Sequence, residues 1–224
     1  MSADIAACVA SRVTKFAGKF ASRVAISYQE ASAFFPKETT ALIGQPIRSA
    51  SLPPENYKRV YENKERPVIM ILCGSQGSQR INEAILEILP NLLDKYDIVH
   101  QTGPANLEEI KKVTTEMLKE HKFKNHYFVD GFIDVSLFYP KVDMVITRGS
   151  SAMFEIALWQ LPMLVIPIPE TISRDQCSNA YAMAGRGVAS VLEENNISKS
   201  IFFTEISRIL DNQESYKKLS EAGV

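Results

Sequence analysis

Three stretches of small and polar residues each follow an apolar run, and their residue types suit the binding of phosphates and sugars. They are Gly74-Ser75-Gln76-Gly77, Thr147-Arg148-Gly149-Ser150-Ser151 and the segment 169–176. Glycines let a phosphate approach the backbone, and hydroxyl and amide groups can pair with phosphate and sugar oxygens. A helical pattern follows each stretch, so all three are candidates for a ligand site.

The stretch from Gly74 to Ser78 could hold an anion at the start of a helix. A helix N-terminus offers unpaired N–H groups and a partial positive charge, and the Ser75 hydroxyl adds a donor. The stretch is not a Walker loop, because no Gly-Lys-Ser/Thr follows, and it is not a Gly-x-Gly-x-x-Gly fingerprint. A plain strand-to-helix turn explains the same residues, so both interpretations stay open.

Glu155 falls in the first turns of the helix expected after Ser151. A carboxylate at this point can accept both hydroxyls of a ribose, as the acidic residue of a nucleotide-binding fold does. The alternative is a negative charge that only stabilises the positive end of the helix dipole. The residues alone favour neither role.

Gln176 and Asn179 share one face of the helix that Asp175 would begin, because they are three residues apart. Amides both donate and accept hydrogen bonds, as the hydroxyls of a sugar require. An exposed polar helix face is the alternative. His100 ends a strand pattern and is expected to be structural rather than catalytic.

The composition excludes several classes of function. The chain has 224 residues, of which 46% are hydrophobic and 23% charged, and its net charge of -1 gives no basic field for a nucleic acid. The three cysteines lack the spacing of a metal or redox site, so we expect reduced thiols and no metal. No apolar run is long enough to span a bilayer, and the N-terminus does not resemble a signal peptide.

Strand and helix patterns alternate from Pro67 to the end of the chain. The continuous apolar run Val68–Leu72 is typical of a strand buried on both faces. Further strands are expected at 96–101, 127–129, 144–147, 163–168 and 189–192, and helices at 81–93, 106–121, 135–139, 151–160, 175–185 and 197–210. This alternation predicts an α/β fold with a doubly wound parallel sheet, which binds ligands at the carboxyl ends of its strands.

The first 66 residues are less regular. Apolar side chains recur at helical spacing over the first 24 residues, and the apolar runs at 24–28 and 39–43 predict short strands. The segment from Ser49 to Arg66 contains Pro53-Pro54 followed by a charged stretch, so we expect a linker with at most one helix.

Five segments of the chain resemble the MurG family of glycosyltransferases, which belongs to glycosyltransferase family 28. They are GSQGSQRINEAI, HQTG, VDGFID, ITRGSSAMFEIALWQLPMLVIPIP and SRDQCSNA, in the order and spacing of that family, and the resemblance extends from Asp4 to the C-terminus. It implies an inverting hexosyltransferase that moves GlcNAc from UDP-GlcNAc to undecaprenyl-pyrophosphoryl-MurNAc-pentapeptide. This step converts lipid I to lipid II in peptidoglycan synthesis, and so serves cell wall biogenesis, cell shape and cell division.

The resemblance also implies a GT-B fold, with two Rossmann-like domains that face each other across a cleft. Residues 1–48 would be the incomplete end of an N-terminal acceptor domain, 49–66 a linker and 67–224 the UDP-GlcNAc-binding domain. The catalytic base and the lipid-linked acceptor site would belong to the part of the family fold that this sequence lacks, so we expect this chain alone to be inactive. A nucleotide-sugar-binding subunit that needs a partner chain, or an inactive remnant, is the alternative.

The same resemblance implies a cellular setting and a set of partners. The full protein would be peripheral to the cytoplasmic side of the bacterial inner membrane. UDP-GlcNAc would be its donor substrate, and no further cofactor, metal or nucleic acid would be required.

Residues that match the motifs of the family are expected to bind the nucleotide. Ser75 would contact the diphosphate, Ile133 would contact uracil through its backbone, and Glu155 would bind the ribose hydroxyls. The phosphate loop would comprise Gly74, Gln76 and Gly77, and the loop over the phosphates Ser150, Ser151, Ala152, Met153 and Phe154.

Other matching positions are expected to contact the donor sugar or the donor site. Arg48 ends the segment GQPIR, which resembles the GNPVR of the family, and Ser11 replaces an asparagine that touches the donor sugar. Gln176 and Asn179 would hold the GlcNAc hydroxyls. Cys73 stands where the family has a glycine, which is a departure within the phosphate loop.

Overall fold

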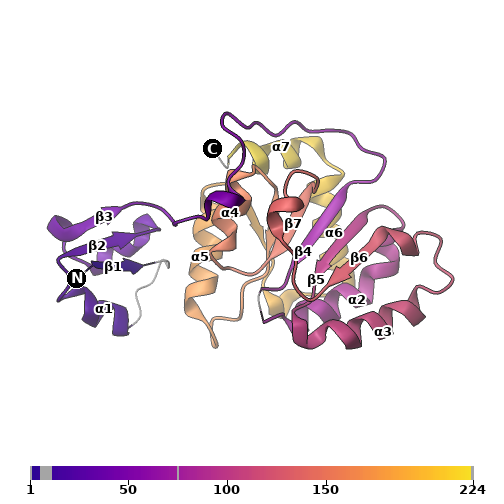
Figure 1. Ribbon diagram of the computed structural model, residues 1–224, viewed down its shortest axis with the longest axis horizontal. Coiled ribbons are helices and arrows are strands. Elements are labelled where there is room, and N and C mark those ends of the chain that lie inside the picture. Colours follow the sequence, from indigo (N-terminus) through magenta and orange to yellow (C-terminus); the bar gives the residue numbers. More distant parts are fainter. Residues whose placement is uncertain (1, 6–11, 75, 223–224) are drawn as a thin grey trace.

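The computed structural model describes residues 2–5, 12–74 and 76–222. In this part of the chain the strands form two parallel sheets, one of three strands in the order β1-β2-β3 and one of six in the order β6-β5-β4-β7-β8-β9. Figure 1 shows the smaller sheet at one side of the larger body, joined to it by an extended stretch of chain. The α/β class and the doubly wound parallel sheet predicted from the sequence are confirmed.

The larger sheet reverses its winding between β4 and β7. Its strands are β4 (Val68–Leu72), β5 (Asp97–Gln101), β6 (Tyr127–Asp130), β7 (Met144–Thr147), β8 (Met163–Val165) and β9 (Ala189–Val191). The helices are α2 (Gln79–Leu93), α3 (Leu107–Met117), α4 (Ala152–Leu158), α5 (Arg174–Gly185), α6 (Lys199–Leu210) and α7 (Gln213–Glu221). The chain places β5 and β6 on one side of β4, and β7 to β9 on the other. Such a switch point opens a ligand crevice at the carboxyl ends of the strands.

Alternate residues of β4 face opposite sides of the sheet, and different helices cover the two sides. Ile69 and Ile71 pack in the core cluster that contains residues of α2 and α6. Met70 and Leu72 pack in the cluster that contains residues of α4 and α5. Because both faces are buried, the strand is apolar along its whole length, and each buried side chain contributes about 1.5–3 kcal/mol.

The smaller sheet corrects one prediction from the sequence. It consists of β1 (Ser2–Ile5), β2 (Arg23–Ile26) and β3 (Thr40–Leu42), with helix α1 (Arg12–Gly18) between β1 and β2. The helical spacing counted from Ile5 was therefore wrong at its start, because Ile5 belongs to a strand in register with Ile26. A partner strand that is distant in sequence decides this conformation, and local spacing cannot reveal it.

The segment 49–66 contains one 3-10 turn, Ser49–Ser51, and then runs to Arg66 without a regular element. It is nevertheless fixed to the larger sheet. Trp159 Nε1 donates to the carbonyl oxygen of Ser51 at 2.8 Å, and Arg59 Nε donates to Tyr216 Oη at 3.1 Å. The segment therefore behaves as part of the larger body, whereas the domain division at 48 and 66 stays a prediction.

Helix α7 was not expected from the sequence. Its nine residues, QESYKKLSE, are mostly polar, so they carry little apolar periodicity. Tyr216 is the buried anchor of this helix, and it packs edge-on against Tyr61 at a ring distance of 5.0 Å. Among the helices of the described residues, none is long and apolar enough to cross a membrane.

Candidate functional site

A cavity of about 800 Å³ lies where the carboxyl ends of β4 and β7 meet. Gly74 follows β4, Arg148 follows β7, and Gln176 comes from the first turn of α5, and all three line this cavity. The three stretches that the sequence singled out therefore contribute to one cavity. It occupies the switch point of the sheet, which is the usual place for a ligand in such folds.

Gly74, Gln76 and Gly77 line the cavity directly before α2. The φ angles of Gly74 and Gly77 are +82° and +81°, and the Gly77 N–H donates to the Gly74 carbonyl at 3.1 Å, so the loop is a tight left-handed turn. Ser78 then caps the helix, since its Oγ accepts the N–H of Ile81 at 3.3 Å. The remaining N–H groups at the start of α2 favour an anion. Ser75 lies outside the described residues.

Gly77 also touches the backbone of the loop after β5. A Cβ atom on Gly77 would lie 2.3 Å from the carbonyl oxygen of Thr102, and a Cβ atom on Gly103 would lie 2.5 Å from Gly77 Cα. Both glycines have a left-handed φ angle. Glycine is therefore required at both positions for packing as well as for conformation, and this contact fixes the turn before α2.

Arg148 is a cavity residue to which the sequence analysis gave no role. Its buried guanidinium donates from Nη1 to Glu194 Oε2 at 2.6 Å and to the Ile166 carbonyl at 3.1 Å, and from Nη2 to Ser78 Oγ. Arg148 thus joins the loops after β8 and β9 to the cap of α2. The available signal was an arginine placed directly after the largely apolar strand Met144–Thr147, where a buried charge requires partners.

Arg48 and Glu155 bring opposite charges to the same cavity. Arg48 is exposed. Hydrogen bonds from Ser136 lower the pKa of Asp134, and the positive charge of Arg48 lowers this pKa further. Glu155 is half-buried in the first turn of α4. The cavity therefore presents both a cation and a carboxylate, which suits a ligand that carries negative charge and hydroxyl groups.

The predicted loop over the phosphates divides into two parts. Ser150, Ser151 and Ala152 line the cavity. Met153 is fully buried in the core, and Phe154 packs edge-on against Tyr28 with the ring centroids 4.9 Å apart. These two side chains hold α4 in place, and the contact of their backbone with phosphates stays a prediction.

Gln176 and Asn179 also lie at different depths. Gln176 lines the cavity, and its Oε1 accepts the N–H of Ile168 at 3.4 Å. Asn179 is buried, and its Nδ2 donates to the carbonyl oxygen of Gly149 at 3.5 Å. Asn179 therefore supports the loop after β7, while Gln176 faces the ligand space. Ser11 lies outside the described residues, so its predicted contact with the sugar is not described.

Gln101 links two predicted nucleotide contacts and was assigned no role from the sequence. Its Nε2 donates to the carbonyl oxygen of Gly74 at 3.1 Å, and its Oε1 accepts the N–H of Ile133 at 3.0 Å. The predicted backbone contact of Ile133 with uracil would therefore use the Ile133 carbonyl, or would require Gln101 to move. The Gln101 side chain ties the phosphate loop to this position.

Cys73 and His100 form a buried polar network with Asn82. Asn82 Oδ1 lies 3.1 Å from Cys73 Sγ and 3.0 Å from His100 Nε2, and His100 Nδ1 lies 2.9 Å from Tyr127 Oη. Burial lowers the pKa of His100 to about 3 and raises the pKa of Cys73 to about 12, so both groups are neutral near pH 7. The histidine is structural, as expected. Within the residues described, no cluster of histidine, cysteine and acidic side chains could hold a metal ion.

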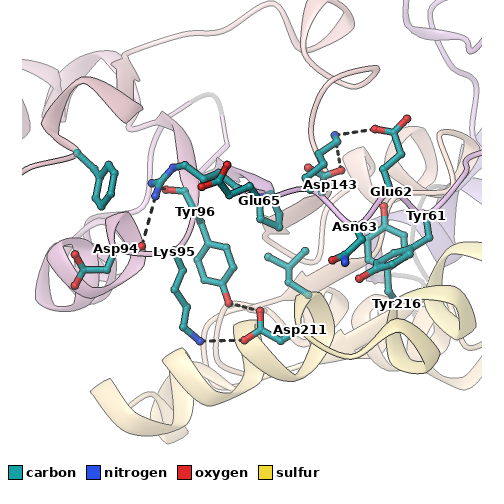
Figure 2. A pocket seen from close by; sticks show the side chains of 15 residues that line it. Tyr61, Glu62, Asn63, Glu65, Asp94, Lys95, Tyr96, Asp143, Asp211 and Tyr216 are labelled. Atoms are coloured by element: carbon teal, nitrogen blue, oxygen red, sulfur yellow. Dashed lines mark hydrogen bonds and ion pairs between the residues drawn. The ribbon is translucent and has the colours of Figure 1, made fainter.

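A second cavity, of about 520 Å³, lies at the opposite edge of the larger sheet, where Pro67, Tyr96 and Asp143 directly precede β4, β5 and β7. Figure 2 shows Tyr96 and Lys95 directed at Asp211, at 2.9 and 3.1 Å. Most of the charged groups here pair with one another, such as Lys64 with Asp143 and Arg66 with Asp97, so this cavity is less suited to a ligand than the first.

Comparison with known proteins gives a family. The sequence model of the family described as "Glycosyltransferase family 28 C-terminal domain" matches residues 68–223. Two relatives carry the name UDP-N-acetylglucosamine--N-acetylmuramyl-(pentapeptide) pyrophosphoryl-undecaprenol N-acetylglucosamine transferase. The relative from Bacillus anthracis, numbered 2 there, is 35% identical over 91% of this chain and 57% of its own length. The relative from Staphylococcus aureus strain JH9 is 30% identical over 91% of this chain and 58% of its own.

Solved structures share the fold. The crystal structure of Acinetobacter baumannii MurG matches with a TM-score of 0.69 at 19% identity, over 99% of this chain and 60% of that one. A Staphylococcus aureus MnaA structure described as a UDP co-structure matches with a TM-score of 0.65 at 15% identity, over 93% of this chain and 56% of that one. The chain thus spans little more than half the length of the proteins it matches.

Proposed function

This chain belongs to the family described as the glycosyltransferase family 28 C-terminal domain, and from that membership we propose that its cavity binds UDP-GlcNAc. The whole protein would be an inverting transferase that moves GlcNAc to undecaprenyl-pyrophosphoryl-MurNAc-pentapeptide. The name of the curated relatives supports this reaction. In this proposal, residues 67–224 supply the donor-binding half.

The observation that carries the proposal is the meeting of a helix N-terminus, arginines and a carboxylate in one cavity at the switch point. The diphosphate would lie at the start of α2, where Arg48 adds positive charge. Arg148, which is paired with Glu194, would act by bracing the cap of α2. Glu155 would accept the ribose hydroxyls from the first turn of α4. This arrangement matches a nucleoside diphosphate, whose negative charges and hydroxyls lie on neighbouring groups.

The remaining predicted contacts extend from the two ends of the nucleotide. Ile133 would recognise uracil through its carbonyl group, because its N–H already donates to Gln101. Gln176 would hold hydroxyls of the GlcNAc, and Asn179 would act by supporting the loop that contains Gly149.

In the proposed reaction, the C4 hydroxyl of MurNAc attacks C1 of GlcNAc as the bond from C1 to the UDP oxygen breaks. The configuration at C1 inverts, and the proton of the hydroxyl passes to a general base. The leaving diphosphate gains negative charge, which the start of α2 and Arg48 would stabilise. We place the base, the acceptor site and the contact with the cytoplasmic side of the membrane in the part of the protein that this chain does not include.

A second candidate function is a nucleotide-sugar-binding subunit that works with a separate acceptor chain. The chain spans 57% of the length of the Bacillus anthracis relative, and this coverage fits either candidate. Both candidates require the same donor site, so donor binding is the property to test first.

The test is calorimetric titration of the chain with UDP and UDP-GlcNAc. We expect binding of both, and we expect Glu155→Gln to weaken it about tenfold or more, because a charged hydrogen-bond acceptor is lost. Glu87→Gln makes the same chemical change on an exposed face of α2 and should leave affinity unchanged. No heat and no thermal shift with millimolar UDP would refute the donor site.

A further inference from the structure

Tyr139 is a buried residue of the cavity whose hydroxyl makes no well-formed hydrogen bond in the part of the chain that the structure describes. Its side chain is 0% exposed, and it lines the same cavity as Glu155 and Arg48. Within the described residues, Tyr139 Oη makes no hydrogen bond of ordinary length and angle, but it lies close enough to Glu155 for a weaker interaction with that carboxylate. Leaving a buried hydroxyl unsatisfied costs about 1–3 kcal/mol, so a residue that served packing alone would be better as phenylalanine.

The position of Tyr139 is well fixed. Its N–H donates to the carbonyl oxygen of Val135 at 3.0 Å, and its ring packs against Trp159 with the centroids 6.0 Å apart. Its carbonyl oxygen accepts from Arg59 Nη1 at 3.4 Å. The phenol is therefore held at the wall of the cavity, where Glu155 is also a lining residue.

The charged groups that act on the phenol identify this partner. Burial raises the pKa of Tyr139, the Glu155 carboxylate raises it further through its charge and through a hydrogen bond, and Arg48 opposes that rise. The phenol is therefore protonated at neutral pH and can donate its proton in a hydrogen bond. Glu155 is the nearby acceptor, and a carboxylate has about four lone-pair positions for donors.

We propose that Tyr139 is a positioning residue for ribose recognition: with a nucleotide bound, its hydroxyl donates to Glu155 and holds that carboxylate toward the 2′ and 3′ hydroxyls. This inference rests on the proposed function, because it assigns Glu155 to the ribose. The two sugar hydroxyls and the phenol would share the lone pairs of one carboxylate. Tyr139 would thereby set the preference for a ribonucleotide over a 2′-deoxyribonucleotide.

The test compares the affinities of UDP and 2′-deoxy-UDP for the wild-type chain and for Tyr139→Phe by calorimetry. We expect the wild-type chain to prefer UDP about tenfold. In Tyr139→Phe, UDP affinity should fall about tenfold while 2′-deoxy-UDP affinity changes little, so the preference is lost. The melting temperature should stay the same or rise, because a buried unpaired hydroxyl is removed.

Two further variants sharpen this test. Tyr181→Phe also removes a hydroxyl that contacts a carboxylate, Glu193 Oε1 at 2.6 Å, but outside the cavity, and it should leave the preference unchanged. In a Glu155→Gln background, Tyr139→Phe should cause no additional loss, because the acceptor is already altered. A wild-type preference that survives Tyr139→Phe would overturn the inference alone, whereas a wild-type chain that does not bind UDP would overturn the proposed function as well.

Discussion

The ring of Tyr28 packs edge-on against the ring of Phe154, with centroids 4.9 Å apart and ring planes at 63°. Tyr28 follows strand β2 of the smaller sheet, and Phe154 precedes Glu155 on α4. A second contact joins the same two parts of the chain, since Arg186 Nη2 lies 3.0 Å from Glu30 Oε2. The smaller sheet therefore rests on the helix that carries a cavity carboxylate, and its position and that of the cavity are physically connected.

Removing this aromatic contact should loosen the smaller sheet. In Phe154→Ala we expect faster hydrogen exchange of backbone amides in residues 23–28, because an aromatic pair contributes about 0.5–1.5 kcal/mol beyond its buried area. Phe128→Ala breaks a comparable contact with Phe138, at 5.7 Å, away from the smaller sheet. The exchange is measured by mass spectrometry. If the amides of residues 23–28 exchanged equally fast in both variants, the contact with Phe154 would not be what holds the smaller sheet.

Substitutions at Gly77 and Gly74 can separate the stability cost of backbone strain from the stability cost of a steric clash. Both have a left-handed φ angle, but a Cβ on Gly77 meets the Thr102 carbonyl at 2.3 Å, whereas a Cβ on Gly74 meets nothing within 4 Å. We expect Gly74→Ala to cost about 1–2 kcal/mol from backbone strain alone, and Gly77→Ala to cost more. Urea unfolding of the two variants provides the measurement, and equal losses would contradict the packing argument.

Acid should destabilise the chain through His100. Its pKa is lowered from 6.5 to about 3 by burial, so the folded state keeps it neutral while the unfolded chain protonates it below about pH 6.5. The free energy of unfolding is unaffected by His100 titration above pH 6.5. Below that pH it falls by about 1.4 kcal/mol per pH unit as the pH drops toward 3. Denaturant unfolding at pH 7.5 and pH 5 should show this loss in the wild-type chain.

His100→Gln is the matched variant for this pH effect, because an amide cannot titrate. The variant is expected to be less stable at pH 7.5, since it disturbs the contacts with Asn82 and Tyr127. Between pH 7.5 and pH 5, however, the free energy of unfolding of this variant should fall by about 2 kcal/mol less than that of the wild-type chain. If the variant and the wild-type chain lost the same unfolding free energy between pH 7.5 and pH 5, His100 would not be the group that takes up a proton on unfolding.

Arg59 should be the main attachment of the segment 49–66. Its Nη1 donates to Tyr57 Oη at 3.0 Å and its Nε to Tyr216 Oη at 3.1 Å, and its Nη2 donates to the Val142 carbonyl. We expect Arg59→Ala to lower the free energy of unfolding by about 3 kcal/mol, because several charge-assisted hydrogen bonds are lost together. Arg208→Ala, which removes an exposed pair with Glu205, should cost less than about 1 kcal/mol in the same urea experiment.

Local patterns predicted the regular part of the fold well. The run Val68–Leu72 is a strand, and the helix expected at 81–93 is α2, with its start shifted to Gln79. Both follow from side-chain periodicity, which depends on neighbours in sequence. Local patterns failed for Ile5, whose strand needs a distant partner, and for α7, whose polar sequence carries little periodicity.

The sequence by itself determined the alternation of strands and helices, and with it the edge of the sheet at which Gly74, Ser150 and Gln176 had to meet. Only the tertiary structure decided which side chains face the cavity and which support it: Arg148 braces the cap of α2, Gln101 joins Gly74 to Ile133, and Tyr139 lies at the cavity wall beside Glu155. The physical reason is that periodicity assigns a residue to an element and a face. Hydrogen bonds between residues far apart in sequence depend on how the elements pack, and no local pattern contains that information.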